Sequence, residues 1–313
     1  MTVAELNDET AFAGVVDRHR GELQVHCYRM LGSYEEAEDL TQETFLRAWR
    51  RRETYAERAS LRAWLYRIAT NACLDALEKR PKTPTANGEI TWLQPYPEEQ
   101  LEAVAAADED VFGRETIELA FLVAIQHLAP RPRAVLLLRD VLGWRAKDTA
   151  ELLETTTAGV NSALQRARAV LKEHLPPERG DWTAAGSSSE RELLERYIAL
   201  TESGDALGIK ALMHEDARFA MPPDEGTYFG RDTIVDAWLS GGFGAPDFGD
   251  FKCVTTRANG QPAVVNYIRK PGAEVFELGA LDVLRIEGGV ITDITAFYGP
   301  ALKPFGLPNT LAV

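Results

Sequence analysis

Residues 146–171 read AKDTAELLETTTAGVNSALQRARAVL, and this stretch decides how the middle of the chain folds. Its apolar residues recur at steps of three and four in two sets, Ala150 and Leu153, then Val160, Leu164, Ala167 and Leu171. Such spacing places each set on one face of a helix. We therefore predict a short helix, a tight turn and a longer helix, which is the pattern of a helix-turn-helix motif.

The residues before this motif have helical spacing as well. Ile117, Phe121 and Ile125 form one apolar stripe, Pro130 opens a further helix, and Gly143 ends it. Together with the motif, these helices predict a helical domain over residues 113–176.

The N-terminal part, residues 1–85, predicts a separate helical domain with three helices. Gly32 ends the first helix, and Ser33 with Glu36 forms a capping box for the second. The third begins at Ser60, and Pro81 stops it. An apolar stripe in the first helix supports this prediction and comprises Phe12, Val15, Val16, His19, Leu23, Cys27 and Met30.

Two segments are predicted to be linkers, residues 86–112 and 177–189. The first is acidic but contains the apolar motif WLQPYP at residues 92–97. We expect these aromatic side chains to dock on a neighbouring domain, and the contact could itself be a control point. The residues assigned to this contact are Trp92, Leu93, Pro95 and Tyr96.

Residues 190–313 predict an α+β domain. Ser189 and Glu192 form a capping box for a first helix, and a second helix follows Gly230. From residue 251 the pattern changes to strands, separated by turn signals at Asn259-Gly260, Pro271-Gly272 and Gly288-Gly289. Helices followed by a meander predict a curved sheet.

The composition places the chain in a broad class. Among 313 residues, 45% are hydrophobic and 26% charged, which excludes collagen-like and wholly disordered proteins. No apolar run reaches the roughly 18 residues of a membrane helix, and the acidic N-terminus is unlike a secretory signal. Cys27, Cys73 and Cys253 form neither a disulfide framework nor a zinc motif. We expect a cytoplasmic protein without membrane contact, cofactor or metal.

The charge is distributed unevenly. The chain carries a net −14, but residues 1–80 hold 12 basic and 14 acidic side chains and residues 115–175 hold 8 and 7. Residues 190–313 hold 11 and 18. Nucleic-acid binding must therefore depend on local clusters, and binding to free DNA should be weak because few counterions are released.

Two clusters have side chains suited to nucleic acid. If Val160 faces the core, the longer helix of the motif exposes residues that can bond base edges or phosphates, namely Asn161, Ser162, Gln165, Arg166 and Arg168. Aromatic residues interleaved with arginines suit unstacked bases, and such a set spans Tyr55, Arg62, Tyr66, Arg67 and Asn71. By its position relative to the stripe, we assign Trp64 to the core and expect Tyr66 to be exposed.

Three long motifs carry a family resemblance. EEAEDLTQETFLRAWRR, SLRAWLYRIATNACLDALEKR and LAPRPRAVLLLRDVLGWRAKDTAELLETTTAGVNSALQRARAVL closely resemble bacterial sigma factors of the extracytoplasmic-function group. The resemblance covers about residues 10–175. Residues 190–313 resemble a SnoaL-like domain, the cone-shaped α+β fold of polyketide cyclases, through GTYFGRDTIVDAW and the β-rich end. Some sigma factors of this group carry such an extension.

The resemblance implies a transcription initiation factor that binds core RNA polymerase through its beta-prime clamp helices and beta flap, and also binds promoter DNA. The clamp helices would meet Asp39, Gln42, Glu43, Leu46 and Trp49. The set from Tyr55 to Asn71 would open the −10 element, with Asn71 reading a flipped base, and the helix-turn-helix would read the −35 element. Many relatives have Arg where this chain has Asn161, so the −35 preference is not carried over.

The C-terminal domain leaves two functions open. Its fold family includes enzymes, and side chains able to act as acid or base are His214, Asp216, Tyr228, Asn266, Tyr267, Glu277 and Asp293. No pair of them lies in a motif that fixes a reaction. We therefore expect a domain that regulates activity in cis and is not an enzyme, with a small-molecule ligand left open. The alternatives are a cyclase-like enzyme tethered to a DNA-binding module, and a helix-turn-helix regulator that acts without polymerase.

Overall fold

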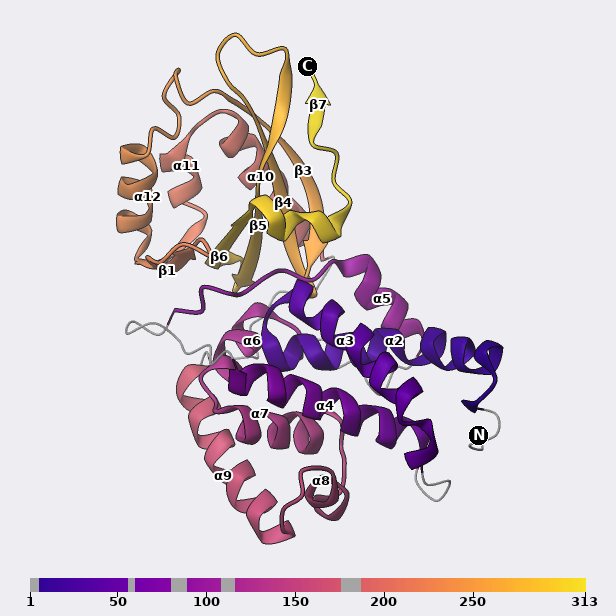
Figure 1. Ribbon diagram of the computed structural model, residues 1–313. Coiled ribbons are helices and arrows are strands. Elements are labelled where there is room, and N and C mark those ends of the chain that lie inside the picture. Colours follow the sequence, from indigo (N-terminus) through magenta and orange to yellow (C-terminus); the bar gives the residue numbers. More distant parts are fainter. Residues whose placement is uncertain (1–5, 56–59, 80–88, 108–115, 176–186) are drawn as a thin grey trace. The chain divides into compact units, whose positions relative to one another are not determined.

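The computed structural model describes residues 6–55, 60–79, 89–107, 116–175 and 187–313 (Figure 1). The chain divides into two compact units. The first unit holds the described residues up to Leu93 and from Glu99 to Leu175. The second holds Gln94–Glu98 together with the described residues from Ser187 onward. Most of the predicted linker 177–189 lies outside the described residues.

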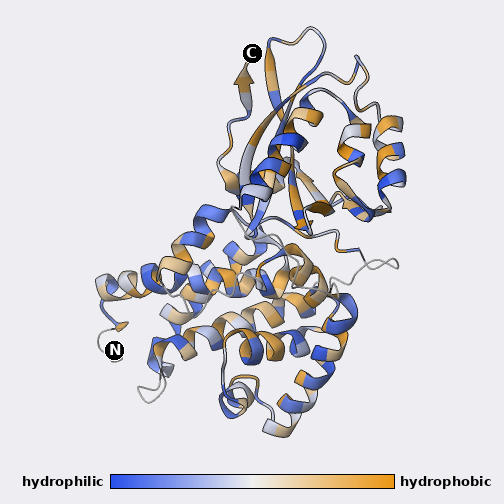
Figure 2. Ribbon diagram, turned by 180° about the vertical axis from the view of Figure 1, so that it is seen from behind, coloured by the Kyte–Doolittle hydropathy of each residue, from blue (hydrophilic) through white to orange (hydrophobic). Residues whose placement is uncertain are grey.

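The first unit is helical, as predicted. Its helices are α2 (Glu9–Leu31), α3 (Tyr34–Arg50), η1 (Arg52–Thr54), α4 (Leu61–Lys79), α5 (Glu98–Ala107), α6 (Leu119–Gln126), α7 (Pro130–Leu136), η4 (Leu137–Val141), α8 (Ala146–Leu152) and α9 (Thr157–His174). We call α2–α4 the first helical domain and α6–α9 the helix-turn-helix domain. Hydrophobic residues gather on the helix faces that pack together (Figure 2).

Local signals set the helix ends in the first helical domain. Gly32 ends α2 with a left-handed φ of 72°. Ser33 caps α3, and its hydroxyl accepts a hydrogen bond from Glu36 N at 3.4 Å. The Ser60 hydroxyl accepts one from Ala63 N at 3.1 Å at the start of α4. These boundaries agree with the prediction, because short polar side chains satisfy the unpaired N–H groups of a helix start.

The helix-turn-helix motif is confirmed. α8 and α9 are joined by a turn in which Glu154 has a φ of 52°. The Thr156 hydroxyl caps α9 by accepting a hydrogen bond from Gly159 N at 3.0 Å. α9 buries Val160, Leu164 and Ala167, so its other face is available to solvent.

The sequence did not predict α5. It lies within the stretch assigned to a linker, whose residues 108–112 are outside the described part of the chain. Leu101 and Val104 of α5 are buried. The helix forms because Leu, Glu and Ala are strong helix formers and two apolar side chains three residues apart share one face.

The second unit has the predicted α+β fold. Its helices are α10 (Ser188–Glu202), α11 (Ala206–Lys210), α12 (Arg231–Ser240) and η5 (Gly299–Phe305), and its strands are β1 (Met213–Ala220), β2 (Tyr228–Phe229), β3 (Asp250–Ala258), β4 (Gln261–Arg269), β5 (Val275–Glu287), β6 (Val290–Tyr298) and β7 (Thr310–Ala312). One mixed sheet has the order β2-β1-β6-β5-β4-β3, with β7 paired to β5. β1 and β6 are parallel, and the other pairs are antiparallel.

The three predicted turns connect consecutive strands from β3 to β6. Asn259 and Gly260 both have positive φ, at 57° and 73°, as a two-residue hairpin turn requires. The predicted capping box at Ser189 is wrong, because the N-cap of α10 is Ser187, whose hydroxyl accepts from Glu190 N at 3.1 Å. Either serine is followed by glutamate three residues later, so the sequence rule alone does not distinguish them.

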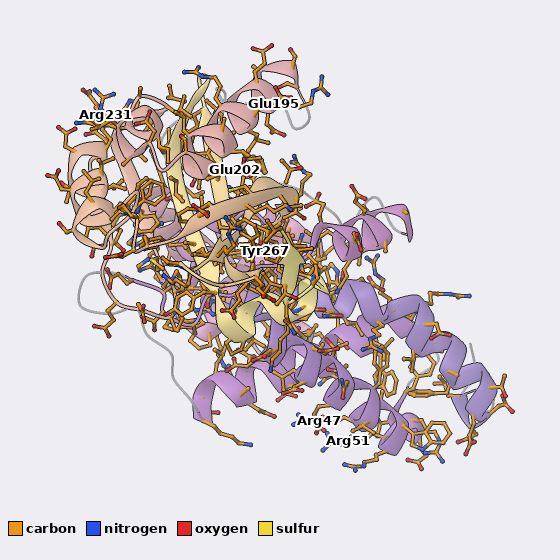
Figure 3. The ribbon with its side chains drawn as sticks, turned by 90° about the horizontal axis from the view of Figure 1, so that it is seen from above. Arg47, Arg51, Glu195, Glu202, Arg231 and Tyr267 are labelled. Atoms are coloured by element: carbon orange, nitrogen blue, oxygen red, sulfur yellow. The ribbon has the colours of Figure 1, made fainter. Side chains whose placement is uncertain are left out.

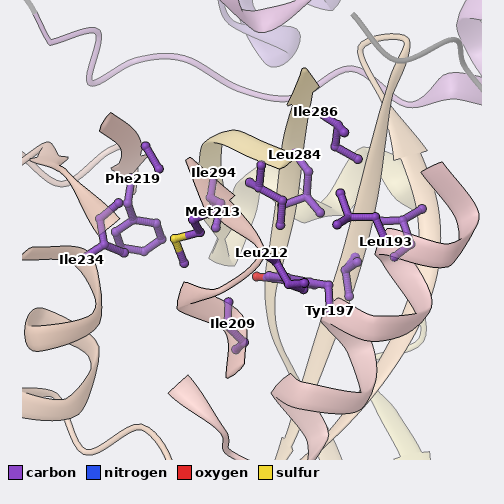
Figure 4. Packing of buried hydrophobic residues seen from close by; sticks show 14 of the residues in the cluster. Leu193, Tyr197, Ile209, Leu212, Met213, Phe219, Ile234, Leu284, Ile286 and Ile294 are labelled. Atoms are coloured by element: carbon purple, nitrogen blue, oxygen red, sulfur yellow. The ribbon is translucent and has the colours of Figure 1, made fainter. Parts of the chain in front are cut away.

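The core of the second unit lies between the helices and one face of the sheet. Leu193 and Tyr197 of α10 pack with Leu212, Met213 and residues of β5 and β6 (Figure 4). The strands contribute alternate residues to this core, such as Leu284 and Ile286. The Tyr197 hydroxyl adds a polar group to this otherwise apolar cluster.

Candidate functional surfaces

The outer side of α3 forms a ridge between two grooves. Asp39, Gln42 and Leu46 are exposed along it, and Glu43 and Trp49 are half-buried beside them. Leu46 is 50% exposed, which is unusual for a large apolar side chain. All five residues assigned to polymerase binding therefore lie on one side of one helix, as the helical spacing predicted. We call this set the α3 ridge.

One groove follows the contact of α2 with α3. It has a volume of about 360 Å³ and is lined by Phe12, Val16, Arg20, Thr41, Gln42, Phe45, Leu46 and Trp49. The Phe12 and Trp49 rings pack at 5.0 Å between centroids, and the Arg52 guanidinium lies 4.4 Å from the Trp49 ring. The groove is apolar at its floor and therefore suits apolar side chains of a partner.

A second groove follows the contact of α3 with α4. It has a volume of about 280 Å³, and Leu31, Leu40 and Leu77 contribute its apolar part. Arg47 lines this groove and donates hydrogen bonds to Glu43 at 2.8 Å and to Asp75 at 3.0 Å. Figure 3 labels Arg47 among the side chains of the helical unit. These contacts raise the pKa of Arg47, with the Glu43 hydrogen bond as the main cause.

The predicted −10 set comprises Tyr55, directly after η1, and four residues of α4, but the exposure of its aromatic side chains differs from the prediction. Tyr66 is fully buried and Trp64 is half-buried, so the expectation of an exposed Tyr66 and a core Trp64 is wrong. Tyr55 is buried against Trp64, with ring centroids 5.5 Å apart. Arg67 is exposed and Asn71 is half-buried.

Tyr66 is buried because α2 and the segment before α8 pack against it. Its ring makes edge contacts with His26 of α2, at 5.0 Å, and with Trp144 of the helix-turn-helix domain, at 5.6 Å. Its hydroxyl donates a hydrogen bond to Glu22 at 3.1 Å. Burial, followed by the Glu22 charge, raises the pKa of Tyr66. Burial, followed by the charge of Arg29, lowers the pKa of His26 to about 3.

The helix-turn-helix domain covers part of the −10 set. Besides the Tyr66–Trp144 contact, the Arg67 guanidinium pairs with Glu154 at 3.2 Å. Both partners come from the segment around α8. The structure thus places the two proposed DNA-reading domains against each other.

Buried polar contacts join the same two domains at the end of α2. Arg133 donates hydrogen bonds to the Met30 carbonyl and to the side chain of Gln126, and Gln126 Nε2 donates to the Arg29 carbonyl at 3.3 Å. Arg29 in turn donates to Thr116 at 2.6 Å. A cation at the C-terminal end of a helix is favourable. Burial nevertheless lowers the pKa of Arg133 to about 10.

The predicted −35 set shares one exposed face of α9. Asn161, Ser162, Gln165 and Arg166 are all exposed there. Arg168 is exposed too, but its guanidinium makes two hydrogen bonds to Asp140, at 2.8 and 2.7 Å. The side chain is therefore held in one orientation before any phosphate is bound.

The WLQPYP motif divides between the two units. Trp92 and Leu93 belong to the first unit, where a Cβ added to Gly32 would lie 3.4 Å from Trp92 Nε1 and 3.2 Å from Gln126 Cδ. Gly32 thus combines a positive φ, which favours glycine, with a tight approach of neighbouring side chains. Sequence reasoning treated the motif as a single docking element.

The second half of the motif, with the glutamate that follows it, binds the turn between β3 and β4. Tyr96 and Asn259 exchange two hydrogen bonds, from Tyr96 N to Asn259 Oδ1 at 2.8 Å and from Asn259 N to the Tyr96 carbonyl at 3.0 Å. Glu98 accepts one from Gly260 N at 2.8 Å. Tyr96 and Asn259 are buried, so this segment is an integral part of the second unit.

The proposed acid and base residues of the second unit differ in exposure and in their partners. His214, Asp216 and Glu277 are exposed, and Asp293 accepts a hydrogen bond from Arg218 at 2.9 Å. Tyr267 is buried, whereas Tyr228 is exposed and its ring packs on Phe219. Of the seven, only Asn266 joins a buried polar cluster.

That cluster centres on Asp282, which the sequence did not single out. Asp282 Oδ2 accepts hydrogen bonds from the Tyr197 hydroxyl at 2.9 Å and from Asn266 Nδ2 at 2.6 Å. The thiol of Cys253 donates to Asn266 Oδ1 at 3.2 Å. Burial raises the pKa of Asp282 to about 6, although the two hydrogen bonds oppose the shift. Burial also raises the pKa of Cys253 to about 12, so the thiol is a poor nucleophile.

The described residues offer neither a metal site nor a membrane span. No group of three or more His, Cys, Asp or Glu side chains in that part of the chain could hold a metal ion. No helix within the described ranges is both long and apolar enough to cross a membrane.

Three family models match the chain in order. Sigma-70 region 2 matches residues 15–83, Sigma-70, region 4 matches residues 118–171, and the SnoaL-like domain matches residues 194–294. The first two cover the first helical domain and the helix-turn-helix domain, and the third covers most of the second unit.

Individual proteins are similar over the same regions. ECF RNA polymerase sigma factor SigG of Mycobacterium tuberculosis (strain ATCC 25618 / H37Rv) is 40% identical over 318 residues, covering 96% of this chain and 85% of that protein. ECF RNA polymerase sigma factor SigW of Bacillus subtilis (strain 168) is 29% identical over 171 residues, covering 54% and 90%. The crystal structure of the M. tuberculosis extracytoplasmic function sigma factor SigJ has a TM-score of 0.64 at 21% identity, covering 95% and 99%, which shows a shared fold.

Proposed function

This chain belongs to the extracytoplasmic-function RNA polymerase sigma factors, and we propose which of its surfaces carry out the initiation of transcription that defines that family. The α3 ridge binds the clamp helices of core RNA polymerase, η1 and α4 open the −10 element, and α9 reads the −35 element. One observation carries the assignment: every predicted polymerase contact lies on a single exposed ridge that includes an apolar side chain open to solvent.

The α3 ridge has the composition of a binding surface for a basic helix pair. Leu46 and the half-buried Trp49 supply apolar contact, and Asp39 and Glu43 supply negative charge. Apolar and aromatic residues at the centre of an interface carry most of its binding energy, and surrounding charges steer association. We place the clamp helices along this ridge, with their apolar residues in the groove between α2 and α3. Work with core polymerase also implies a cytoplasmic site of action.

The promoter surfaces differ in their readiness. The α9 face is exposed, and its Asn, Gln and Arg side chains can bond adenine and guanine edges in the major groove. The −10 set is partly covered by Trp144 and Glu154. The −10 and −35 elements are separate stretches of duplex, so both cannot be read while the two domains are packed together. We therefore assign the packed arrangement to the free protein.

Regulation by the C-terminal domain is proposed to act through the linker. Trp92 packs in the helical unit beside Gly32 and Gln126, and Tyr96 and Glu98 are held by the turn at Asn259-Gly260. Gln126 is also part of the contact between the two DNA-reading domains. A domain that holds Tyr96 can therefore influence that contact through the chain between residues 92 and 98.

We propose no enzymatic role for the C-terminal domain. Three of the predicted side chains, His214, Asp216 and Glu277, are exposed to solvent. Asp282 is engaged by Tyr197 and Asn266. The alternative, a cyclase-like enzyme tethered to a DNA-binding module, would need an enclosed acid–base pair, whereas these three predicted side chains are open to solvent. A small-molecule ligand would act as a signal in this scheme.

In vitro transcription with core polymerase tests the proposal. Asn71→Ala should lower promoter opening without affecting core binding, and Asp39→Arg should weaken core binding at low salt and less so at high salt. Full promoter opening by Asn71→Ala would remove Asn71 from base reading. Undiminished pull-down of core polymerase by Asp39→Arg would remove Asp39 from the polymerase contact.

The regulatory part has its own test. Trp92→Ala, Asn259→Gly and removal of residues 177–313 should all shift transcription in the same direction relative to the full chain. Glycine tolerates the positive φ of residue 259 while removing the acceptor for Tyr96 N, so Asn259→Gly isolates that hydrogen bond. The exposed Asn309→Ala is the matched control. If only the truncation changes activity, the linker is not the route.

A further inference from the structure

Glu22 is a buried carboxylate at the centre of the −10 surface. It lies on α2 and is 7% exposed. Its Oε1 pairs with His19 Nδ1 at 2.5 Å, and its Oε2 accepts hydrogen bonds from Arg62 Nε at 2.7 Å and from the Tyr66 hydroxyl at 3.1 Å. Two of its three partners are therefore members of the −10 set on α4.

The carboxylate remains charged at this buried position. Burial raises its pKa, but hydrogen bonds from His19 and Arg62 and the charge of Arg62 outweigh burial, so the pKa of Glu22 is lowered overall. A buried charge is retained only where its partners compensate for lost hydration. Moving Arg62 or the Tyr66 hydroxyl away would leave the buried charge of Glu22 without a partner that compensates for its lost hydration. The free-energy cost of that loss keeps both side chains in place.

The contacts fix a defined arrangement of an arginine and an aromatic ring. The Arg62 guanidinium carbon lies 5.7 Å from the Tyr66 ring centroid, within the range of a cation–π contact. The Arg62 side chain is 38% exposed and so reaches solvent beside the ring. The edges of the Tyr66 ring meet His26 and Trp144, and only Trp144 belongs to the helix-turn-helix domain.

We propose that Glu22 is a positioning residue for promoter opening. It orients Arg62 and Tyr66 so that, once the helix-turn-helix domain has moved away, the guanidinium meets the phosphate backbone and the ring stacks on an unpaired base. Such stacking and phosphate contacts are the usual means of holding single-stranded DNA. The inference rests on the proposed −10 role of these two residues. Glu22 itself touches no DNA in this scheme.

The experiment measures the rate of promoter opening by the full chain with core polymerase. Glu22→Gln keeps the shape of the side chain and removes its charge, and it should slow opening about tenfold, since a hydrogen bond to a charged group contributes that much. Asp17→Asn, an exposed position on the same helix, is the matched control and should open promoters at the normal rate. Thermal unfolding and core binding of each variant are measured alongside.

A combined variant distinguishes positioning from general destabilisation. In the Arg62→Ala/Tyr66→Phe background, adding Glu22→Gln should change the opening rate less than twofold, because the guanidinium and the hydroxyl that Glu22 binds have been removed. A further tenfold loss in that background would overturn the proposal, as would normal opening by Glu22→Gln alone. If Arg62→Ala/Tyr66→Phe itself opens promoters normally, the −10 assignment fails and this inference with it.

Discussion

The two functional faces of the first helical domain differ in access. The α3 ridge is open to solvent, with Leu46 half exposed, whereas Tyr66 on α4 is covered by Trp144 and Arg67 is paired with Glu154. Under the proposed assignment, the polymerase surface is accessible in the free protein and the −10 surface is partly covered. If that assignment holds, we expect core binding to precede promoter opening.

A substitution on the exposed α3 ridge should give the largest effect, on core polymerase binding. Leu46→Arg should weaken core polymerase binding by about 2 kcal/mol or more, because it places a charge at the apolar centre of the interface. Leu239→Arg on α12 is the matched control, since Leu239 is 49% exposed against 50% for Leu46. A titration of core polymerase that gives equal affinity for both variants would show that the α3 ridge is not the contact.

Acidification should lower the unfolding free energy of the helical unit and raise that of the second unit. His26, behind Tyr66, stays neutral when folded because burial and then the Arg29 charge lower its pKa to about 3. The unfolded chain takes up this proton below about pH 6.5, so the unfolding free energy of the helical unit should fall by about 2 kcal/mol between pH 7 and pH 5.

Acidification changes the unfolding free energy in the opposite direction through Asp282. Its pKa is raised by burial to about 6, so the folded form holds a proton that the unfolded form releases above about pH 4. The second unit should therefore gain about 1 kcal/mol of unfolding free energy between pH 7 and pH 5. His26→Gln and Asp282→Asn should each remove their own part of the response in melts at both pH values. If the stability of Asp282→Asn depends on pH as that of the native chain does, Asp282 does not contribute to the response.

Access to the −10 surface should depend on Trp144, whose ring contacts Tyr66. Trp144→Ala should tighten binding of the free chain to a single-stranded −10 oligonucleotide by about three- to tenfold, since an aromatic pair contributes about 0.5–1.5 kcal/mol. Fluorescence anisotropy measures this affinity. Unchanged affinity, with the helix-turn-helix domain still folded by circular dichroism, would mean that Trp144 does not control access to Tyr66.

The smallest effect is expected at α9. Arg168 is exposed and already paired with Asp140, and exposed ion pairs contribute about 0–1 kcal/mol. Arg168→Ala should therefore weaken all promoters alike and by less than about fivefold, whereas Gln165→Ala and Arg166→Ala should change −35 selectivity. Identical scores for the three variants in a −35 promoter library would refute this division of roles.

The sequence predicted the features that depend on one helix or one hairpin. The α3 ridge follows from the spacing of Asp39, Gln42 and Leu46, and the strand turns follow from Asn259-Gly260 and the glycine pairs. These patterns are local, because helical and strand periods decide which side chains share a face.

Features that depend on distant parts of the chain were not predictable. The burial of Tyr66 is caused by Trp144, which the periodicity of α4 cannot reveal. Glu22 and Asp282 look like ordinary surface carboxylates until the fold brings Arg62, Tyr66, Tyr197 and Asn266 to them. The same holds for the divided linker motif, whose two halves find partners in different units.

The most direct test of the account is the distance between α4 and α9 in the free and polymerase-bound chain. Spin labels at the exposed positions Glu78→Cys and Glu173→Cys, in a Cys253→Ser background, report it by pulsed electron resonance. We expect one narrow, short distance between the two labels in the free full chain and a clearly longer one after core polymerase is added. A distance that core polymerase leaves unchanged, or one already long in the free chain, would contradict the claim that the −10 surface is uncovered only on polymerase.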